Sequence, residues 1–312
     1  MSPIELILPR AADLGEGMIV RRALPTRQRR MVGAWCFLDH AGPVDFAPGG
    51  GMHVGAHPHT CLQTFTWLID GEVLHRDSLG HEQWIRPGQV NLMTAGHGIV
   101  HTEDSAPGAR RLHAAQLWIA LPPELADCPP AFEHYPDLPR WQDAGCTLTL
   151  LAGRFGGRES PARIHTPLVG MDLRASQDAQ LALPLDPSFE YGLLPLEGSM
   201  DIAGQHFRPT AVADQHLVAS FEFHFDLLAL LVVLAVAHGD DLAPLGLFLG
   251  GVGNDDAAPS GFFLGKPLDE HAIGQRLEFH DSSYGIGSGC DTLEKVVLSG
   301  SRKYSILIVV RF

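Results

Sequence analysis

Cysteine pairs, long apolar runs and positive charge are all scarce in this sequence, and each shortage excludes a class of protein. The five cysteines are odd in number, scattered, and form no Cys-x-x-Cys pair, so neither a disulfide framework nor a thiolate zinc site is expected. The longest nearly unbroken apolar run, residues 227–237, is too short to span a bilayer. The first residues lack the basic end and the apolar stretch of a signal peptide. We therefore expect a soluble protein of the cytoplasm with no membrane partner.

The shortage of positive charge bears on nucleic acids. Lys and Arg number 22 against 36 Asp and Glu, and the formal net charge is −14. A nucleic-acid surface needs clustered Lys and Arg. The one basic cluster, within residues 21–30, is short and is typical of solvated strand ends. Direct binding of nucleic acid is not expected.

Short apolar segments separated by turn residues make up most of the chain. The 34 glycines and 23 prolines are spread throughout, and helical periodicity is poor over the first 220 residues. Asp70-Gly71 and Pro87-Gly88 are typical of tight turns, because glycine accepts the positive φ that these turns need. An all-β fold, a barrel or a sandwich, is predicted, with strands at residues 31–38, 61–69, 72–76, 90–94, 113–120 and 146–151.

A proline-rich and acidic stretch near residues 122–143 divides two strand-rich halves. The second half has the same pattern of short apolar segments separated by turns, and its turn pair Glu197-Gly198 matches Asp70-Gly71 in the first half. For a chain of 312 residues we predict an N-terminal barrel (1–125), a linker (126–143) and a C-terminal barrel (144–312) that diverges after about residue 210.

Two pairs of polar residues at strand spacing carry the chemistry. Residues i and i+2 of a strand share a face, so His57 and His59 point together, and so do His101 and Glu103. If both pairs meet, three imidazoles and a carboxylate can hold iron(II), manganese, nickel, copper or zinc with positions left open. A single His-x-His is more often incidental than a metal site. The nearby His53, His81 and His97 either lie behind the ligands or at the pocket mouth, or are ordinary loop residues.

These segments resemble one family. "HPHTCLQTFTWLIDGEVLHRDSLGH", "PGQVNLMTAGHGIVHTE" and "LHAAQLWIALP" are similar to the pirin family of the cupin superfamily. The resemblance covers most of residues 9–122 and continues loosely to about residue 208. It implies two face-to-face cupin barrels, with a metal, usually iron, held by His57, His59, His101 and Glu103. The family usually has Glu where this chain has Gln63.

The resemblance also implies a function. Several pirins open the ring of the flavonol quercetin with dioxygen, and others are metal- or redox-responsive partners of transcription regulators or metabolic enzymes. As a dioxygenase, this protein would use Glu103 as both ligand and base for the 3-hydroxyl proton. If alternation continues from His59, Gln63, Phe65 and Trp67 would share the ligands' face and line the substrate pocket.

Two other functions stay open at this stage. The dioxygenase would bind a small aromatic substrate and O2, whereas a regulatory protein would bind a protein partner. A cupin isomerase acting on a sugar through zinc or manganese would need polar pocket walls, which the aromatic residues near the ligands disfavour. A monomer is expected.

Overall fold

The computed structural model describes residues 5–15, 18–184 and 189–198, and the strand segments 200–202, 205–207, 218–221, 293–298 and 304–311. Within these residues the chain is all-β, because a single short 3-10 helix, Pro123–Leu125, accompanies twenty-four strands. The paired strands are antiparallel. In the described part of the chain, no helix has the length and apolarity that crossing a bilayer requires.

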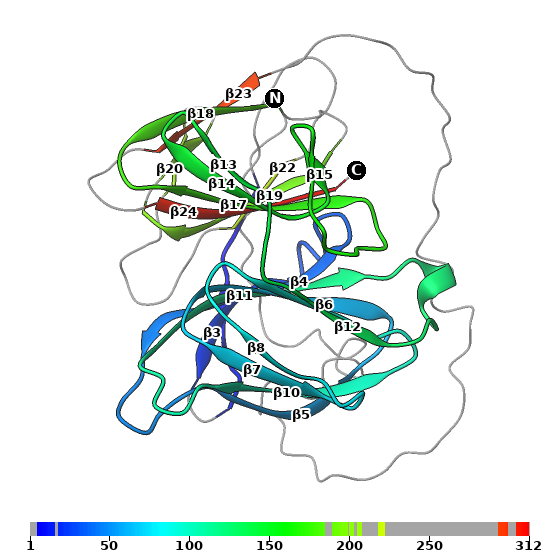
Figure 1. Cartoon of the computed structure of the whole chain (residues 1–312). Coiled ribbons are helices and arrows are strands. Elements are labelled where there is room, and N and C mark those ends of the chain that lie inside the picture. Colours follow the sequence, from blue (N-terminus) through cyan, green and yellow to red (C-terminus); the bar gives the residue numbers. More distant parts are fainter. Residues whose placement is uncertain are drawn as a thin grey trace.

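The strands form two halves, each with one large and one small sheet (Figure 1). In the N-terminal half the large sheet has the order β12-β9-β6-β11-β4-β3-β2 and the small one β5-β10-β7-β8. The members of the large sheet are β2 (Arg10–Asp13), β3 (Ile19–Leu24), β4 (Trp35–Asp45), β6 (Leu62–Asp70), β9 (Val90–Thr94), β11 (Arg111–Ala120) and β12 (Ala131–Tyr135). Those of the small sheet are β5 (His53–His59), β7 (Val73–Asp77), β8 (Glu82–Ile85) and β10 (Ile99–Ser105).

The second half repeats this layout. Its large sheet has the order β1-β22-β19-β24-β17-β14-β13, with β1 (Glu5–Ile7), β13 (Arg140–Asp143), β14 (Cys146–Ala152), β17 (Leu168–Ala175), β19 (Tyr191–Glu197), β22 (Val218–Phe221) and β24 (Tyr304–Arg311). Its small sheet has the order β18-β23-β20-β21, with β18 (Ala179–Pro184), β20 (Met200–Ile202), β21 (Gln205–Phe207) and β23 (Leu293–Leu298). A separate hairpin joins β15 (Arg154–Phe155) to β16 (Arg158–Glu159).

The two large sheets pack against each other through one hydrophobic core. Trp35, Phe65 and Trp67 of the first sheet share that core with Leu148 and Met171 of the second. The rings of Trp35 and Phe65 meet edge to face, with centroids 5.6 Å apart. A second, smaller core lies inside the N-terminal barrel, between its large and small sheets. The large sheet therefore has buried side chains on both of its faces.

Most of the predicted strands are confirmed. Residues 90–94 coincide with β9, and 61–69, 72–76, 113–120 and 146–151 match β6, β7, β11 and β14 to within two residues at each end. Asp70-Gly71 joins β6 to β7 as predicted. Gly71 has φ +92°, and a Cβ there would lie 2.5 Å from the Arg111 carbonyl oxygen, so the turn requires glycine.

The predicted strand at 31–38 is wrong in its first half. Gly33 has φ +56°, and Val32 makes only an isolated bridge to Trp35. This tight turn delays the start of β4 to Trp35. Val32, before the turn, is buried because it belongs to the core, and not because it belongs to a strand.

The predicted linker contains two strands. β12 pairs with β9 of the N-terminal barrel, while β13 pairs with β14 of the second half. Each end of this segment therefore extends a different barrel. Most of the chain after residue 210, where divergence is predicted, lies outside the described residues.

Candidate metal centre

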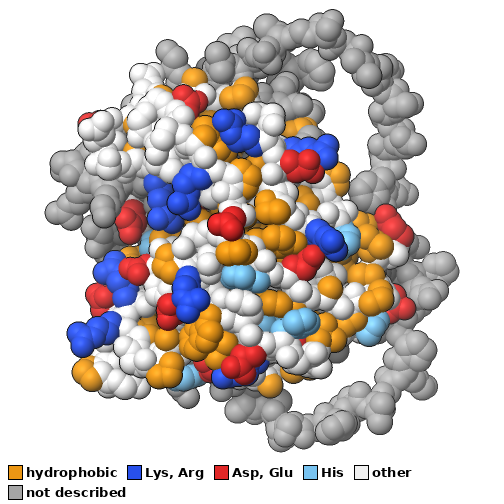
Figure 2. Space-filling view, in the orientation of Figure 1, with side chains coloured by type: hydrophobic (Ala, Val, Ile, Leu, Met, Phe, Trp, Pro, Cys, Tyr) orange, Lys and Arg blue, Asp and Glu red, His pale blue; other side chains and the backbone are white. Residues whose placement is uncertain are grey.

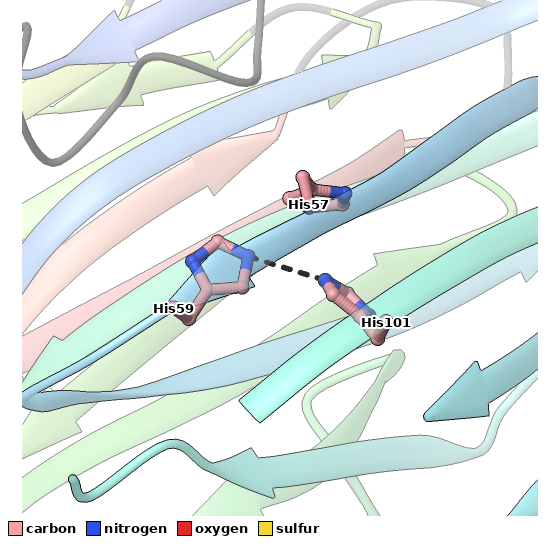
Figure 3. Close-up of side chains that lie close together, drawn as sticks. All are labelled: His57, His59 and His101. Atoms are coloured by element: carbon pink, nitrogen blue, oxygen red, sulfur yellow. Dashed lines mark hydrogen bonds between the residues drawn. The ribbon is translucent and has the colours of Figure 1, made fainter. Parts of the chain in front are cut away.

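Three histidines converge inside the N-terminal barrel. His57 and His59 lie on β5, and His101 lies on the neighbouring β10, where it pairs with His57. Their exposed fractions are 7%, 4% and 2%. The three rings turn toward a common point (Figure 3), and one ring nitrogen from each lies within 4.8 Å of the others. The structure therefore places His57 and His59 together, as strand spacing predicts, and brings His101 beside them.

The spacing of the ring nitrogens fits adjacent ligands of one ion. The Nε2 atoms of His59 and His101 are 3.1 Å apart. Two nitrogen ligands at about 2.1 Å from an ion and at a right angle would be about 3.0 Å apart. Neutral imidazoles of this kind suit several divalent first-row metals. The donor set of this structure therefore fits such an ion.

A backbone contact orients His57. Its Nδ1 lies 2.8 Å from the carbonyl oxygen of Gly55. Since a carbonyl oxygen only accepts, Nδ1 carries the proton and Nε2 keeps its lone pair. His101 pairs with His57 and Glu103 pairs with Val54, so β5 advances by three residues over this interval while β10 advances by two, which makes a β-bulge. This bulge, a feature common beside functional sites, sets where Glu103 lies relative to the histidines.

Glu103 lies close to His101 and to a further histidine, His75, and is not part of the group formed by His57, His59 and His101. A carboxylate oxygen of Glu103 and ring nitrogens of His101 and His75 all lie within 4.8 Å of one another. Burial raises the pKa of Glu103 to about 7, a hydrogen bond with Thr66 opposes that rise, and the nearby Asp104 adds to it. A divalent cation beside this carboxylate would favour its charged form.

Burial keeps the three histidines neutral. It lowers the pKa of His57 despite the hydrogen bond to Gly55, and it lowers the pKa of His59 to about 3, with His57 adding to the effect. The pKa of His101 is also held well below its usual value by burial and by the neighbouring imidazoles. Neutral imidazoles are the form that binds metals, so no proton has to leave these rings near pH 7.

The histidines line a small cavity inside the barrel. The cavity measures about 60 Å³ and is mostly apolar, with Glu103, Thr66, Gln116 and Asp39 as its other polar groups. The Thr66 hydroxyl oxygen and the Gln116 side-chain oxygen are 2.7 Å apart. Asp39 is held by a two-point ion pair with Arg22, each bond 2.9 Å long.

One wall of the cavity is aromatic. Phe37 stacks on Trp118, with ring centroids 4.0 Å apart and planes 12° apart. Trp118 in turn meets His59 edge to face at 4.9 Å. The sequence predicts an aromatic wall beside the ligands, but these two residues form it, from β4 and β11. Sequence reasoning missed them, although Gln116 and Trp118 stand two residues apart in a predicted strand.

The predicted pocket residues Phe65, Trp67 and Gln63 lie on the opposite face of the sheet. Cys61 takes a positive φ of 59°, so β5 ends at His59 and β6 restarts with the alternation reversed. Phe65 and Trp67 pack into the core between the barrels. The Gln63 amide donates to Thr94 at 2.9 Å and to the Arg163 carbonyl at 3.1 Å. The expectation that these three side chains share the ligands' face is wrong, because it assumed one unbroken strand.

A second row of polar groups stands behind His101. The Nδ1 atoms of His101 and His75 are 3.3 Å apart, and His75 Nε2 lies 3.1 Å from Asp77 Oδ2. His81 reaches the same carboxylate at 3.0 Å from the exposed side, so it contacts the polar groups behind His101 and does not line the cavity. Sequence reasoning missed His75 and Asp77, although they show the same i, i+2 spacing as the ligand pairs.

One face of the molecule carries charges of both signs. Figure 2 shows Lys and Arg side chains interspersed with Asp and Glu over the described part of this face. The half-exposed His53 joins Asp104 at 3.0 Å, and Asp104 also meets Arg76 at 3.2 Å. His53 therefore belongs to a surface ion-pair network, outside the group of three buried rings.

Comparison with known proteins identifies close relatives. The sequence model of the Pirin family matches residues 17–119. A Pseudomonas aeruginosa protein named "Putative quercetin 2,3-dioxygenase PA1205" is 62% identical over 210 residues, 67% of this chain and 67% of its own length. A "Pirin-like protein" of Caulobacter vibrioides is 39% identical over 57% of this chain and 64% of its own length. The chain thus spans about two thirds of these curated relatives.

Solved structures agree with this comparison. A crystal structure of quercetin 2,3-dioxygenase from Acinetobacter baumannii has a TM-score of 0.72 and 37% identity, covering 99% of this chain and 78% of that one. The bacterial pirin YhhW from Escherichia coli, solved in complex with nickel(II), has a TM-score of 0.58 and 15% identity over 98% of both chains, which shows a shared fold.

Proposed function

The chain belongs to the pirin family, and from that premise we propose that it is a metal-dependent dioxygenase that opens the ring of a flavonol such as quercetin. The observation that carries the proposal is the convergence of three buried, neutral imidazoles on one point. The 62% identity with a relative named for this activity supports it.

His57, His59 and His101 would hold the ion, with Glu103 as the fourth ligand. Iron(II) is the metal we propose, and nickel, copper, manganese and zinc accept the same ligands. When bound, the ion would supply stabilisation of an oxyanion and open positions for dioxygen. The ring nitrogens that face the common point need no deprotonation, since burial keeps these histidines neutral.

Glu103 would take the proton from the substrate's 3-hydroxyl group. Burial raises the pKa of Glu103 to about 7 in the metal-free protein, and a bound cation would hold the carboxylate in the charged form that can accept a proton. Thr66 stands next to this carboxylate, and Gln116 next to Thr66. The stacked Phe37 and Trp118 would face a flat aromatic substrate.

The volume of the cavity favours a second candidate function. About 60 Å³ is room for roughly four water molecules, whereas pockets for drug-sized ligands measure about 300–1,000 Å³. A flavonol therefore requires the barrel to open. A regulatory protein that keeps its ion behind side chains and binds a protein partner needs no such opening.

Two measurements test the proposal. Metal content should fall to background in His59→Ala and stay at one ion per chain in His134→Ala, whose ring contacts Asn91; equal metal content would exclude the site. Oxygen consumption with quercetin is then followed with anaerobically iron-loaded protein. Rapid uptake that is lost in Glu103→Gln supports the dioxygenase, and no uptake from fully iron-loaded protein supports the regulatory function.

A further inference from the structure

Two side chains outside the proposed ligand set connect His101 to a buried carboxylate. His75 and Asp77 lie on β7, which pairs with β10 so that Asp77 stands opposite His101 and His75 opposite Glu103. The contacts run from His101 Nδ1 to His75 Nδ1 at 3.3 Å, and from His75 Nε2 to Asp77 Oδ2 at 3.1 Å. The Asp77 side chain is 0% exposed and that of His75 is 3% exposed.

The chemistry of these groups assigns every proton along the row. A carboxylate only accepts hydrogen bonds, so His75 must carry its proton on Nε2. Its Nδ1 is then an acceptor, and His101 must donate from Nδ1. The Nε2 of His101, which faces His59 Nε2 at 3.1 Å, is left without a proton and can act only as an acceptor or a ligand. Asp77 thus determines, through one intervening ring, that the His101 nitrogen facing the centre carries no proton.

The row is held rigidly. Asp77 Oδ1 accepts hydrogen bonds from the backbone N–H groups of Leu79 and His81 at 2.9 and 3.1 Å. Burial would raise the pKa of Asp77, but the hydrogen bonds from His75, His81 and Leu79 outweigh it and lower that pKa. The His75 ring stacks on Phe132, with centroids 4.2 Å apart and planes 13° apart.

We propose that His75 and Asp77 are positioning residues that fix the tautomer and the orientation of His101 for metal binding, without touching the ion themselves. The inference rests on the proposed metal site. Partners that accept the second N–H of a ligating histidine commonly change metal affinity by about 10–100-fold when they are removed. His75 also lies within 4.8 Å of His101 and Glu103 ligand atoms, so direct coordination by His75 is the competing assignment.

Asp77→Asn tests the positioning role, because the structure fixes the new amide. The Asn oxygen keeps the place of Oδ1, where two backbone N–H groups donate. Its NH2 group then takes the place of Oδ2 and donates to His75 Nε2. His75 must move its proton to Nδ1, which forces the His101 proton onto Nε2, toward the centre. The same substitution disables a triad by imposing the wrong tautomer.

The first readout needs no metal. In ¹⁵N-histidine NMR of the metal-free protein, His101 should carry its proton on Nδ1 in the wild type and on Nε2 in Asp77→Asn. The second readout is cobalt(II) affinity by chelator competition, with the visible cobalt spectrum as a report on its ligands. We expect Asp77→Asn to bind cobalt about 10–100-fold more weakly with an unchanged spectrum.

His81→Gln is the matched control, since His81 contacts the same carboxylate from the exposed side and should bind cobalt like the wild type. His75→Phe, which keeps a flat ring against Phe132, should weaken binding as Asp77→Asn does and leave the spectrum unchanged. An unchanged tautomer and affinity in Asp77→Asn, or a changed spectrum in His75→Phe, would overturn the inference. Failure of wild-type protein to bind cobalt would instead overturn the proposed metal site.

Discussion

The two faces of the seven-stranded sheet of the N-terminal barrel differ in role: one packs in the core between the barrels, and the other lines the cavity that holds the histidines. On the face toward the second barrel, β6 and β11 place Phe65, Trp67, Ala115 and Leu117 in the shared core. On the face toward the cavity, the intervening residues are Thr66, Ala114, Gln116 and Trp118. Neighbouring residues of the same strands therefore serve packing on one side and a candidate reaction chamber on the other.

This difference shows that a residue's place in the in-and-out alternation of its strand, more than its residue type, decides whether it faces the core or the cavity. An aromatic residue in β6 is part of the core, whereas Phe37 in β4 and Trp118 in β11 belong to the cavity. Two local irregularities set these assignments: the positive φ of Cys61, and the register shift where Phe37 pairs with Trp118 but Trp35 pairs with Ile119. Because one residue of shift exchanges the faces, substitutions on the two faces should have separable effects.

The largest effect is expected on the packing face. Trp67→Ala removes a fully buried ring from the core between the barrels, and such truncations lower the free energy of unfolding by about 3–5 kcal/mol. Metal bound per folded chain should not change, since Trp67 points away from the histidines. Urea unfolding followed by far-ultraviolet circular dichroism, with metal analysis of the folded fraction, measures both quantities.

Trp67→Phe is the control for this prediction. It keeps most of the apolar volume and removes an indole N–H that has no hydrogen-bond partner among the described residues, so its effect on stability should be much smaller. Loss of metal from folded Trp67→Ala protein would show that the two faces are not separable.

On the cavity face, Glu103→Gln should stabilise the metal-free protein in a pH-dependent way. The pKa of Glu103 is raised to about 7 from an ordinary 4.5, so the folded state holds this proton more tightly than the unfolded state. Wild-type stability is then lost as pH rises through about 7, whereas the uncharged Gln loses nothing. At about 1.36 kcal/mol per pKa unit, the variant should gain on the order of 3 kcal/mol at pH 8 and little at pH 4.

Thermal unfolding in the presence of a chelator, at both pH values, checks this gain. The same variant with saturating metal should lose its advantage, because the ion stabilises the carboxylate that Gln lacks. A stability difference that is equal at pH 4 and pH 8 would contradict the assigned burial of Glu103.

Much of the fold and the main elements of the site could be predicted from the sequence. Turn pairs such as Asp70-Gly71 and i, i+2 spacing such as His57-x-His59 are local signals, and local signals determined β6, β7 and the pairing of the histidines. The prediction for Phe65 and Trp67 is wrong because of one backbone angle. A pattern of residue types does not reveal the positive φ of Cys61, and without it these two side chains are expected on the wrong face of the sheet. The role of His75 depends on cross-strand register with β10, which spacing within one strand does not give.

The smallest effect is expected at Gln63. Its amide donates to the Arg163 carbonyl at 3.1 Å, and its oxygen accepts from the His165 backbone N–H at 3.4 Å, so Gln63 joins the N-terminal barrel to the segment that leads into β17. An ionised carboxylate at this position cannot donate to Arg163, and a buried acceptor left without its donor costs about 1–3 kcal/mol.

We therefore expect Gln63→Glu to lose about 1–2 kcal/mol at pH 7 and to regain it in acid, where the protonated carboxyl group can donate again. Metal affinity should not change, because Gln63 lies on the packing face and the ligands lie on the other side of the sheet. Parallel urea unfolding and cobalt titrations measure the two quantities. A change in cobalt affinity in this variant, without a change in stability, would mean that a carboxylate at this position acts on the metal. Residues just after Cys61 would then affect the metal from the packing face, and the two faces of the sheet would not be separable there.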